Sequence, residues 1–208
     1  VAQQNIDQAI IHYKNAVRLA PKDSAMRLVL GEAYIAYGDY LSAEKELQKS
    51  IDLGGTENRA LVLLIKAKAK LESIDELDEL IENAESLQDN EYIQVLVYSA
   101  IALLSEHQLG KAQDYADQAS AINADADYSK LGQAYMQYAN ANFEQAMETL
   151  KGNPLLNKLG SEATLLHAHL LFALQQYDEA IVEYKQYRKA HPAAHYVRFY
   201  ETNSAIKA

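Results

Sequence analysis

The sequence predicts an all-α protein, a right-handed superhelix of about twelve antiparallel helices stacked in pairs, and three observations lead to this fold class. Each repeat has one marker position, at the start of its second helix, and the residues four and seven positions after the marker lie on the same helical face. Turn residues such as Gly38–Asp39 separate the helices. A fixed period near 34 residues is typical of a stacked array of one helix pair. The intervals are 34, 34, 35, 34 and 34 residues, between the markers Ala9, Ala43, Leu77, Ala112, Ala146 and Ala180.

The stretch LGEAYIAYGDYLSAEKELQKSI, residues 30–51, shows what each position of the unit requires. Gly31 lies where the two helices of a pair cross, and its missing side chain lets the backbones approach closely. That approach offsets the roughly 1 kcal/mol that glycine costs a helix. Ala43 faces this crossing from the second helix, and Leu47 fills the space beside it. The pattern therefore predicts two helices joined at Gly38–Asp39.

The period divides residues 1–208 into one continuous array. Asp23 and Ser161 begin first helices, and Ser73–Glu76 has the pattern of a capping box. An array that begins with the second helix of one repeat and ends with the first helix of another leaves apolar faces uncovered. We therefore expect a fragment of a longer solenoid. The expected elements are a second helix at 5–20, full repeats at about 23–54, 57–89, 91–123, 125–153 and 161–191, and a first helix at 194–206.

Two repeats depart from the pattern. In the repeat at 57–89, Ile65 and Leu77 stand where glycine and alanine occupy the crossing elsewhere. In the repeat at 125–153, two extra residues lengthen the turn, and Pro154 ends the second helix early.

Composition and charge exclude several classes of function. The net charge of -10 at pH 7 repels phosphate backbones, so we expect no nucleic acid partner. The chain has no cysteine, which removes disulfides, thiolate catalysis and Cys-based zinc sites. No apolar run is long enough to span a bilayer, and no catalytic or cofactor-binding motif occurs. We therefore expect no direct membrane insertion, no enzymatic activity, no cofactor and no metal.

Two groups of ionisable residues can each be interpreted as a ligand-binding site or as an ordinary part of the structure. Residues 71–110 contain no Lys or Arg, and acidic residues crowd one helix there, where a basic partner or Ca²⁺ would fit. A solvated helix face is the favoured interpretation, because the spacing of a Ca²⁺ loop is missing. His191 and His195 are four residues apart, but Pro192 places a helix junction between them, so we expect no metal site.

The motifs LGEAY and GDY, together with the helix-closing Pro21, resemble the signature of the tetratricopeptide repeat (TPR) family. Residues 13–54 also resemble the TPR lipoproteins of the exosortase (PEP-CTERM) system of Gram-negative bacteria. The cues are K-N-A followed by a proline, A-x-R-x-x-L-G, A-E-K-E-L and a closing Leu-Gly. This second resemblance implies a periplasmic protein anchored to the outer membrane that assists exopolysaccharide export or protein sorting. A cytoplasmic protein is the alternative.

In a TPR superhelix the first helices line the concave side, so the TPR resemblance implies which residues face a groove. The lining is mostly apolar, which suits an amphipathic helix or an extended peptide. The same residues could instead be core between repeats. The clamp for chaperone C-terminal peptides needs Lys, Asn and Arg here, and Lys66 alone resembles it, so we reject that function. The candidate groove residues are Leu28, Glu32, Ile35, Val62, Lys66, Val97, Ile101, Leu104, Gln133, Leu165, His169, Phe172 and Phe199.

These observations predict a non-catalytic scaffold that binds a protein or peptide partner in its concave groove. The alternative is a structural spacer, or a segment that associates with itself. Uncovered half-repeats at the two ends would permit a homodimer by end-to-end stacking.

Overall fold

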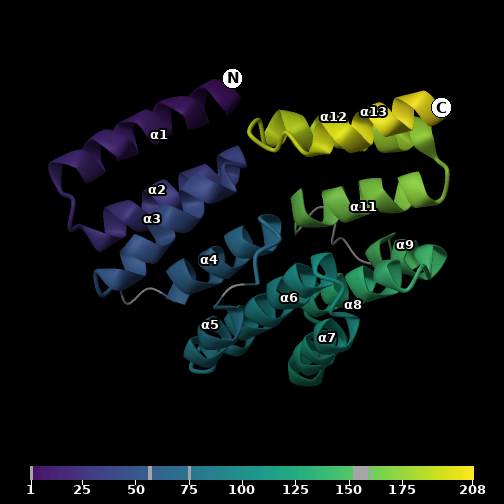
Figure 1. Ribbon diagram of the computed structural model, residues 1–208, viewed down its shortest axis with the longest axis horizontal. Coiled ribbons are helices and arrows are strands. Elements are labelled where there is room, and N and C mark those ends of the chain that lie inside the picture. The colour runs from purple at the N-terminus through teal and green to yellow at the C-terminus, as the bar shows by residue number, and fades with distance from the viewer. Residues whose placement is uncertain (1, 56–57, 75, 152–158, 160) are drawn as a thin grey trace.

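The computed structural model describes residues 2–55, 58–74, 76–151, 159 and 161–208. Within them the chain forms twelve helices and no strand, which confirms the predicted all-α array of paired helices (Figure 1). The helices are α1 Ala2–Leu19, α2 Ser24–Tyr37, α3 Tyr40–Asp52, α4 Asn58–Lys70, α5 Leu77–Ala84, α6 Asp89–Ser105, α7 Leu109–Asn123, α8 Asp127–Ala139, α9 Phe143–Lys151, α11 Ser161–Ala173, α12 Tyr177–Ala190 and α13 Val197–Lys207.

Consecutive helices form the pairs that the period predicts. The first helices α2, α4, α6, α8 and α11 also contact one another along the array, each touching the next first helix in the chain. Pro154, which was expected to end a second helix early, lies outside the described residues. The core follows the stacked first helices and the facing sides of the second helices, so each pair is stabilised both by its own packing and by its neighbours.

The pair α2–α3 shows how the sequence sets the boundaries. The Asp23 carboxylate accepts a hydrogen bond from the Met26 backbone N–H at 3.0 Å and so caps α2. Gly38 ends α2 with φ at 87°, a left-handed conformation that glycine adopts without strain. The Asp39 carboxylate then caps α3 by accepting from the Ser42 backbone N–H at 3.1 Å. The turn therefore forms from two adjacent local signals, Gly38 and Asp39, and Asp23 sets the start of the pair.

Gly31 is the crossing point expected from the sequence. A β-carbon on Gly31 would lie 2.6 Å from Cγ of Leu47, whose side chain is fully buried. We expect Gly31→Ala to lower the free energy of unfolding by about 1–3 kcal/mol, because the overpacked helices must move apart. Urea unfolding followed by circular dichroism measures the change.

Gly110→Ala on α7 is the matched control for that substitution. A β-carbon there would meet nothing within 4 Å. We expect no loss of stability at Gly110, and a gain of up to about 1 kcal/mol from helix propensity. Equal losses at the two glycines would contradict the packing explanation.

The pair α4–α5 departs from the others. The predicted capping box at Ser73–Glu76 is wrong, because α5 begins only at Leu77 and Glu76 makes no side-chain capping bond. Glu76 instead has a φ of 61°, in the left-handed region. Ile65 and Leu77 are both buried where glycine and alanine would allow a close crossing. Accordingly, the eight-residue α5 packs less closely on α4 than α3 packs on α2.

The array curls until the α12–α13 junction meets the α2–α3 turn, near the top of Figure 1. The backbone N–H of Ala193 donates to the carbonyl oxygen of Tyr37 at 3.2 Å. The hydroxyl groups of Tyr40 and Tyr187 lie 3.2 Å apart. Gly38 packs against Ala194. We call this contact between the α2–α3 turn and the α12–α13 junction the seam; it consists of Tyr37, Gly38, Tyr40, Tyr187, His191, Ala193 and Ala194.

Candidate functional site

Many of the predicted groove residues lie inside the protein. Five of them are at most 7% exposed and belong to the packed clusters between helices: Leu28, Ile35, Val62, Val97 and Leu165. These five match the alternative interpretation, that part of the set is core between repeats. A buried side chain cannot contact a partner while the array keeps this form.

The remaining predicted residues are more accessible, and several of them already have partners within the protein. Glu32 forms an ion pair with Arg59, and the Gln133 amide donates to the Ser120 hydroxyl at 3.2 Å. Ile101 and Leu104 pack against the core from partly buried positions. Phe199, on α13, is 66% exposed. The thirteen residues therefore do not line one open groove in this conformation, and their role in binding stays a prediction.

A buried ion triad holds α4 against α11 across the concave side. Glu162 is 2% exposed at the start of α11, and its carboxylate lies 2.7 Å from Lys66 Nζ and 2.9 Å from Lys70 Nζ. Burial raises the pKa of Glu162, but the attraction of Lys70 and Lys66 outweighs it and brings the pKa to about 2. Lys66, the lysine of the predicted groove, is thus already paired with a carboxylate of the protein itself.

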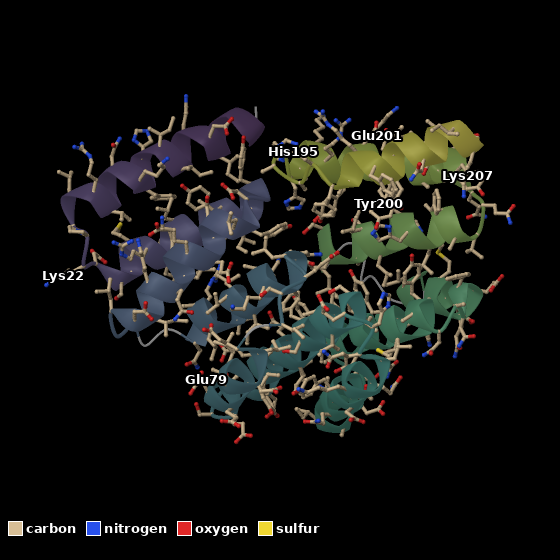
Figure 2. The ribbon with its side chains drawn as sticks, in the orientation of Figure 1. Lys22, Glu79, His195, Tyr200, Glu201 and Lys207 are labelled. Atoms are coloured by element: carbon tan, nitrogen blue, oxygen red, sulfur yellow. The ribbon has the colours of Figure 1, made fainter. Side chains whose placement is uncertain are left out.

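His169 lies within an aromatic cluster near the C-terminal end. Its Nδ1 is 2.8 Å from the Tyr184 hydroxyl, and its ring centroid is 4.6 Å from that of Tyr200. Figure 2 shows Tyr200 between α13 and α11. Burial, followed by the positive charge of Lys70, lowers the pKa of His169 to about 4. The imidazole is therefore neutral at pH 7 and acts in packing.

This shift predicts an acid-sensitive fold. The folded chain binds the His169 proton less readily than the unfolded chain, whose histidine pKa is 6.5. The stabilisation is therefore present above pH 6.5 and is lost as the pH falls toward 4, a change of about 3 kcal/mol. We expect His169→Asn to flatten unfolding free energy against pH in that window. Equal curves for wild type and His169→Asn would contradict the assignment.

His191 and His195, four residues apart in the sequence, lie in different surroundings. The His191 ring packs on Tyr187 with centroids 4.6 Å apart, whereas His195 is exposed at the α12–α13 junction labelled in Figure 2. Within the part of the chain that the structure describes, no group of three or more His, Cys, Asp or Glu side chains could hold a metal ion. No helix among those same residues is long and apolar enough to cross a membrane.

The outer side of the array carries a cavity of about 950 Å³ between α3 and α5, with part of α4 beneath it. Leu41 projects from α3 with 69% of its surface exposed. The cavity is the space left where the short α5 packs loosely on α4, so it follows from the substitutions at the crossing. We call it the outer groove. Its apolar lining is Leu41, Ile51, Leu61, Leu80 and Leu87.

Charged residues surround this apolar lining. The Lys68 side chain is buried in the groove, with Nζ 3.1 Å from Glu44 and 3.7 Å from Glu76. Lys68 therefore ties α3 and the start of α5 to α4. The other charged residues of the groove are Lys45, Asp52 and Glu79. Among the described lining residues, the rim thus has four carboxylates, and Lys45 and the already paired Lys68 are the cations.

One signal for the outer groove was present in the sequence, the acidic stretch at 71–110, which was interpreted as a solvated face. Glu76 and Glu79 of that stretch are exposed, as expected, but they also border the cavity. Leu41 and Leu61 carried no signal, because exposed or half-buried leucines occur at many helix positions. The loose packing of α5 follows from tertiary contacts that the repeat period does not encode.

Comparisons with known proteins support a TPR protein. Residues 1–69 match the sequence model of the tetratricopeptide repeat family. The crystal structure of TTC0263, a thermophilic TPR protein of Thermus thermophilus, has a TM-score of 0.64 and 17% identity, and the match covers 88% of this chain and 99% of that one. No curated protein matches the chain in sequence.

Two larger solved structures share the fold. Cut9–Hcn1 of the APC/C hetero-tetramer has a TM-score of 0.64 and 13% identity over 98% of this chain. Yeast Tom70 has a TM-score of 0.53 and 16% identity over 95% of this chain. The chain spans only 40% and 42% of their respective lengths. At these identities the likeness shows the fold alone.

Proposed function

We propose that this tetratricopeptide repeat array is a non-catalytic scaffold that receives a protein partner in the outer groove. TPR arrays are generally protein–protein interaction scaffolds, and solenoids of this kind offer extended surfaces for binding. The observation that carries the proposal is the cavity of about 950 Å³, which is open between α3 and α5 and contains the exposed Leu41.

The contrast with the concave side favours the outer groove. The ion triad of Glu162, Lys66 and Lys70 lies on the concave side, and the seam joins the α2–α3 turn to the α12–α13 junction. A partner on that side would have to displace buried charges that are already paired. Binding there, which the sequence predicts, is the alternative and requires the seam to open.

Site-specific photo-crosslinking in the host cell tests the proposal. A photoreactive amino acid is placed at Lys45 on the groove rim, or at the exposed Asp114 on α7 as a matched control. We expect a protein that is captured at Lys45 but not at Asp114, and whose capture is lost in Leu41→Glu. The same captured proteins at both positions, with no effect of Leu41→Glu, would contradict the outer groove as the binding surface.

The setting of this scaffold is a further part of the proposal. The resemblance of residues 13–54 to exosortase-system TPR lipoproteins supports a role in the bacterial envelope, in exopolysaccharide export or protein sorting. Fractionation of the producing cells tests it: the protein is expected with the periplasmic or outer-membrane fraction. Recovery only with the cytoplasm would favour the alternative compartment.

Self-association is a second candidate function, favoured by apolar residues exposed on α1 and α13. Ile11 and Leu19 are 59% and 79% exposed, and Phe199 and Ile206 are 66% and 76% exposed. Light scattering after size-exclusion chromatography distinguishes the candidates. A concentration-dependent dimer that Phe199→Lys abolishes would support self-association, and a monomer at all concentrations would remove it.

A further inference from the structure

The outer groove has an apolar centre and an acidic rim, and this combination specifies the kind of partner. Resting on the proposed function, we infer that the occupant is a short amphipathic helix of a partner protein, with one apolar stripe flanked by Lys or Arg. The inference follows from the shape, the apolar lining and the charges of the groove.

The shape fits a helix that lies along the groove. The wall formed by α3 has 13 residues, so it is about 20 Å long at 1.5 Å per residue. Leu41 and Ile51 are on this wall, and Leu80 and Leu87 are on the opposite side. An apolar stripe with residues at helical spacing can contact both sides at once, which is the usual way in which a helix binds a groove.

The charges select a basic partner. Glu44 and Asp52 on α3 face the same space as Glu76 and Glu79 at the start of α5. In Figure 2, Glu79 lies on α5 beside the start of α4. Lys68, paired with Glu44 and Glu76, and Lys45 offset part of this charge, but four carboxylates against two cations leave the described lining net negative. Lys or Arg residues at the edges of a bound helix would therefore be attracted, and Asp or Glu residues would be repelled.

The surroundings strengthen this selection. Residues 71–110 contain no Lys or Arg, and the whole chain has a net charge of -10. An acidic peptide would meet repulsion from the rim and from the chain as a whole. A basic helix would be steered toward the groove, and its binding would weaken as salt screens the attraction.

Fluorescence anisotropy with two synthetic helical peptides tests the inference. One peptide has leucines at helical spacing with lysines elsewhere, and the other has glutamates in place of the lysines. We expect the leucine–lysine peptide to bind and the leucine–glutamate peptide not to bind. Leu41→Ser, which removes the exposed apolar contact, and Glu79→Lys, which reverses a rim charge, should each weaken binding of the first peptide about tenfold.

The control separates the groove from general charge attraction. Asp114→Lys makes the same charge change as Glu79→Lys on the exposed side of α7, outside the groove. We expect it to change affinity less than twofold. Thermal unfolding of each variant checks that the fold is intact. Equal weakening by Glu79→Lys and Asp114→Lys, or equal binding of both peptides, would overturn the inference.

The inference and the proposed function can fail separately. If neither peptide binds, but capture at Lys45 still depends on Leu41, the groove binds a partner of different chemistry and only the inference is overturned. If capture at Lys45 also fails, both are overturned. If the leucine–lysine peptide binds with the expected variant pattern, the inference is supported.

Discussion

Replacing Glu162 by glutamine is expected to lower the free energy of unfolding by about 3–5 kcal/mol. Glu162 is 2% exposed, and its carboxylate lies within 3 Å of the ammonium groups of both Lys66 and Lys70. Glutamine has nearly the same shape but no charge, so two lysines would remain in a buried site without a counter-charge. Urea unfolding at pH 7, followed by circular dichroism, measures the loss.

Two controls keep this prediction specific. Glu148→Gln on the exposed side of α9 should change the free energy of unfolding by less than about 0.5 kcal/mol. Replacing Glu162 and Lys70 together by leucine and methionine should cost less than Glu162→Gln, because one fewer charge stays buried without a partner. A similar loss for Glu148→Gln and Glu162→Gln would contradict the role of the triad.

The same carboxylate adds an acid-dependent signature. Its pKa is about 2 in the folded chain, below the ordinary value of 4.5. Its contribution to stability is therefore fully present above pH 4.5 and is lost as the pH falls toward 2. We expect Glu162→Gln to remove the pH dependence of stability between pH 4.5 and 2. This range lies mostly below the range from pH 6.5 to 4 that is assigned to His169.

Replacing Ala194 by glutamate is expected to open the seam. Ala194 is 1% exposed and packs against Gly38, so a carboxylate there would be buried without a partner. Keeping it buried costs several kcal/mol, which exceeds what the few seam contacts supply. The array would avoid that cost by separating α12 and α13 from the α2–α3 turn while each helix pair stays folded.

Small-angle X-ray scattering with circular dichroism measures this opening. We expect a larger radius of gyration with unchanged helix content in Ala194→Glu. Ala205→Glu on the exposed side of α13 places the same charge outside the seam and should change neither value. An unchanged radius of gyration for Ala194→Glu would mean that the seam tolerates the charge, and that the contact is looser than the structure shows.

The repeat pattern predicted the helix pairs because each pair depends on local signals. Gly31 and Leu47 meet at the expected crossing, Ala43 is fully buried, and Gly38 ends α2 in the left-handed conformation for which glycine is suited. Such contacts lie within one period, so the sequence spacing contains them. For the same reason, the substitutions Ile65 and Leu77 were visible as departures from the pattern.

The closure of the array could not be predicted in this way. The curvature of a solenoid depends on small rotations between repeats, which side-chain packing sets and the period does not. Glu162 and Lys70 are 92 residues apart in the sequence, and neither stands at a signature position. The outer groove escaped prediction for a related reason, since it depends on how loosely α5 packs on α4.

The distance across the seam tests the central claim most directly, namely that the array closes on itself and leaves the outer groove as its open site. The chain contains no cysteine, so cysteines introduced at the exposed positions Ala36 and His195 would be the only thiols for spin labels. The hydrogen bond between Ala193 and Tyr37 places the Cα atoms of these two positions less than about 20 Å apart.

Pulsed electron paramagnetic resonance on the doubly labelled chain gives this distance in solution. We expect one narrow distribution at the short distance that a closed seam requires, and a shift to longer distances when Ala194→Glu is added. A broad distribution centred well beyond that distance in the unmodified background would show an open superhelix, and its concave side would then be the accessible binding surface.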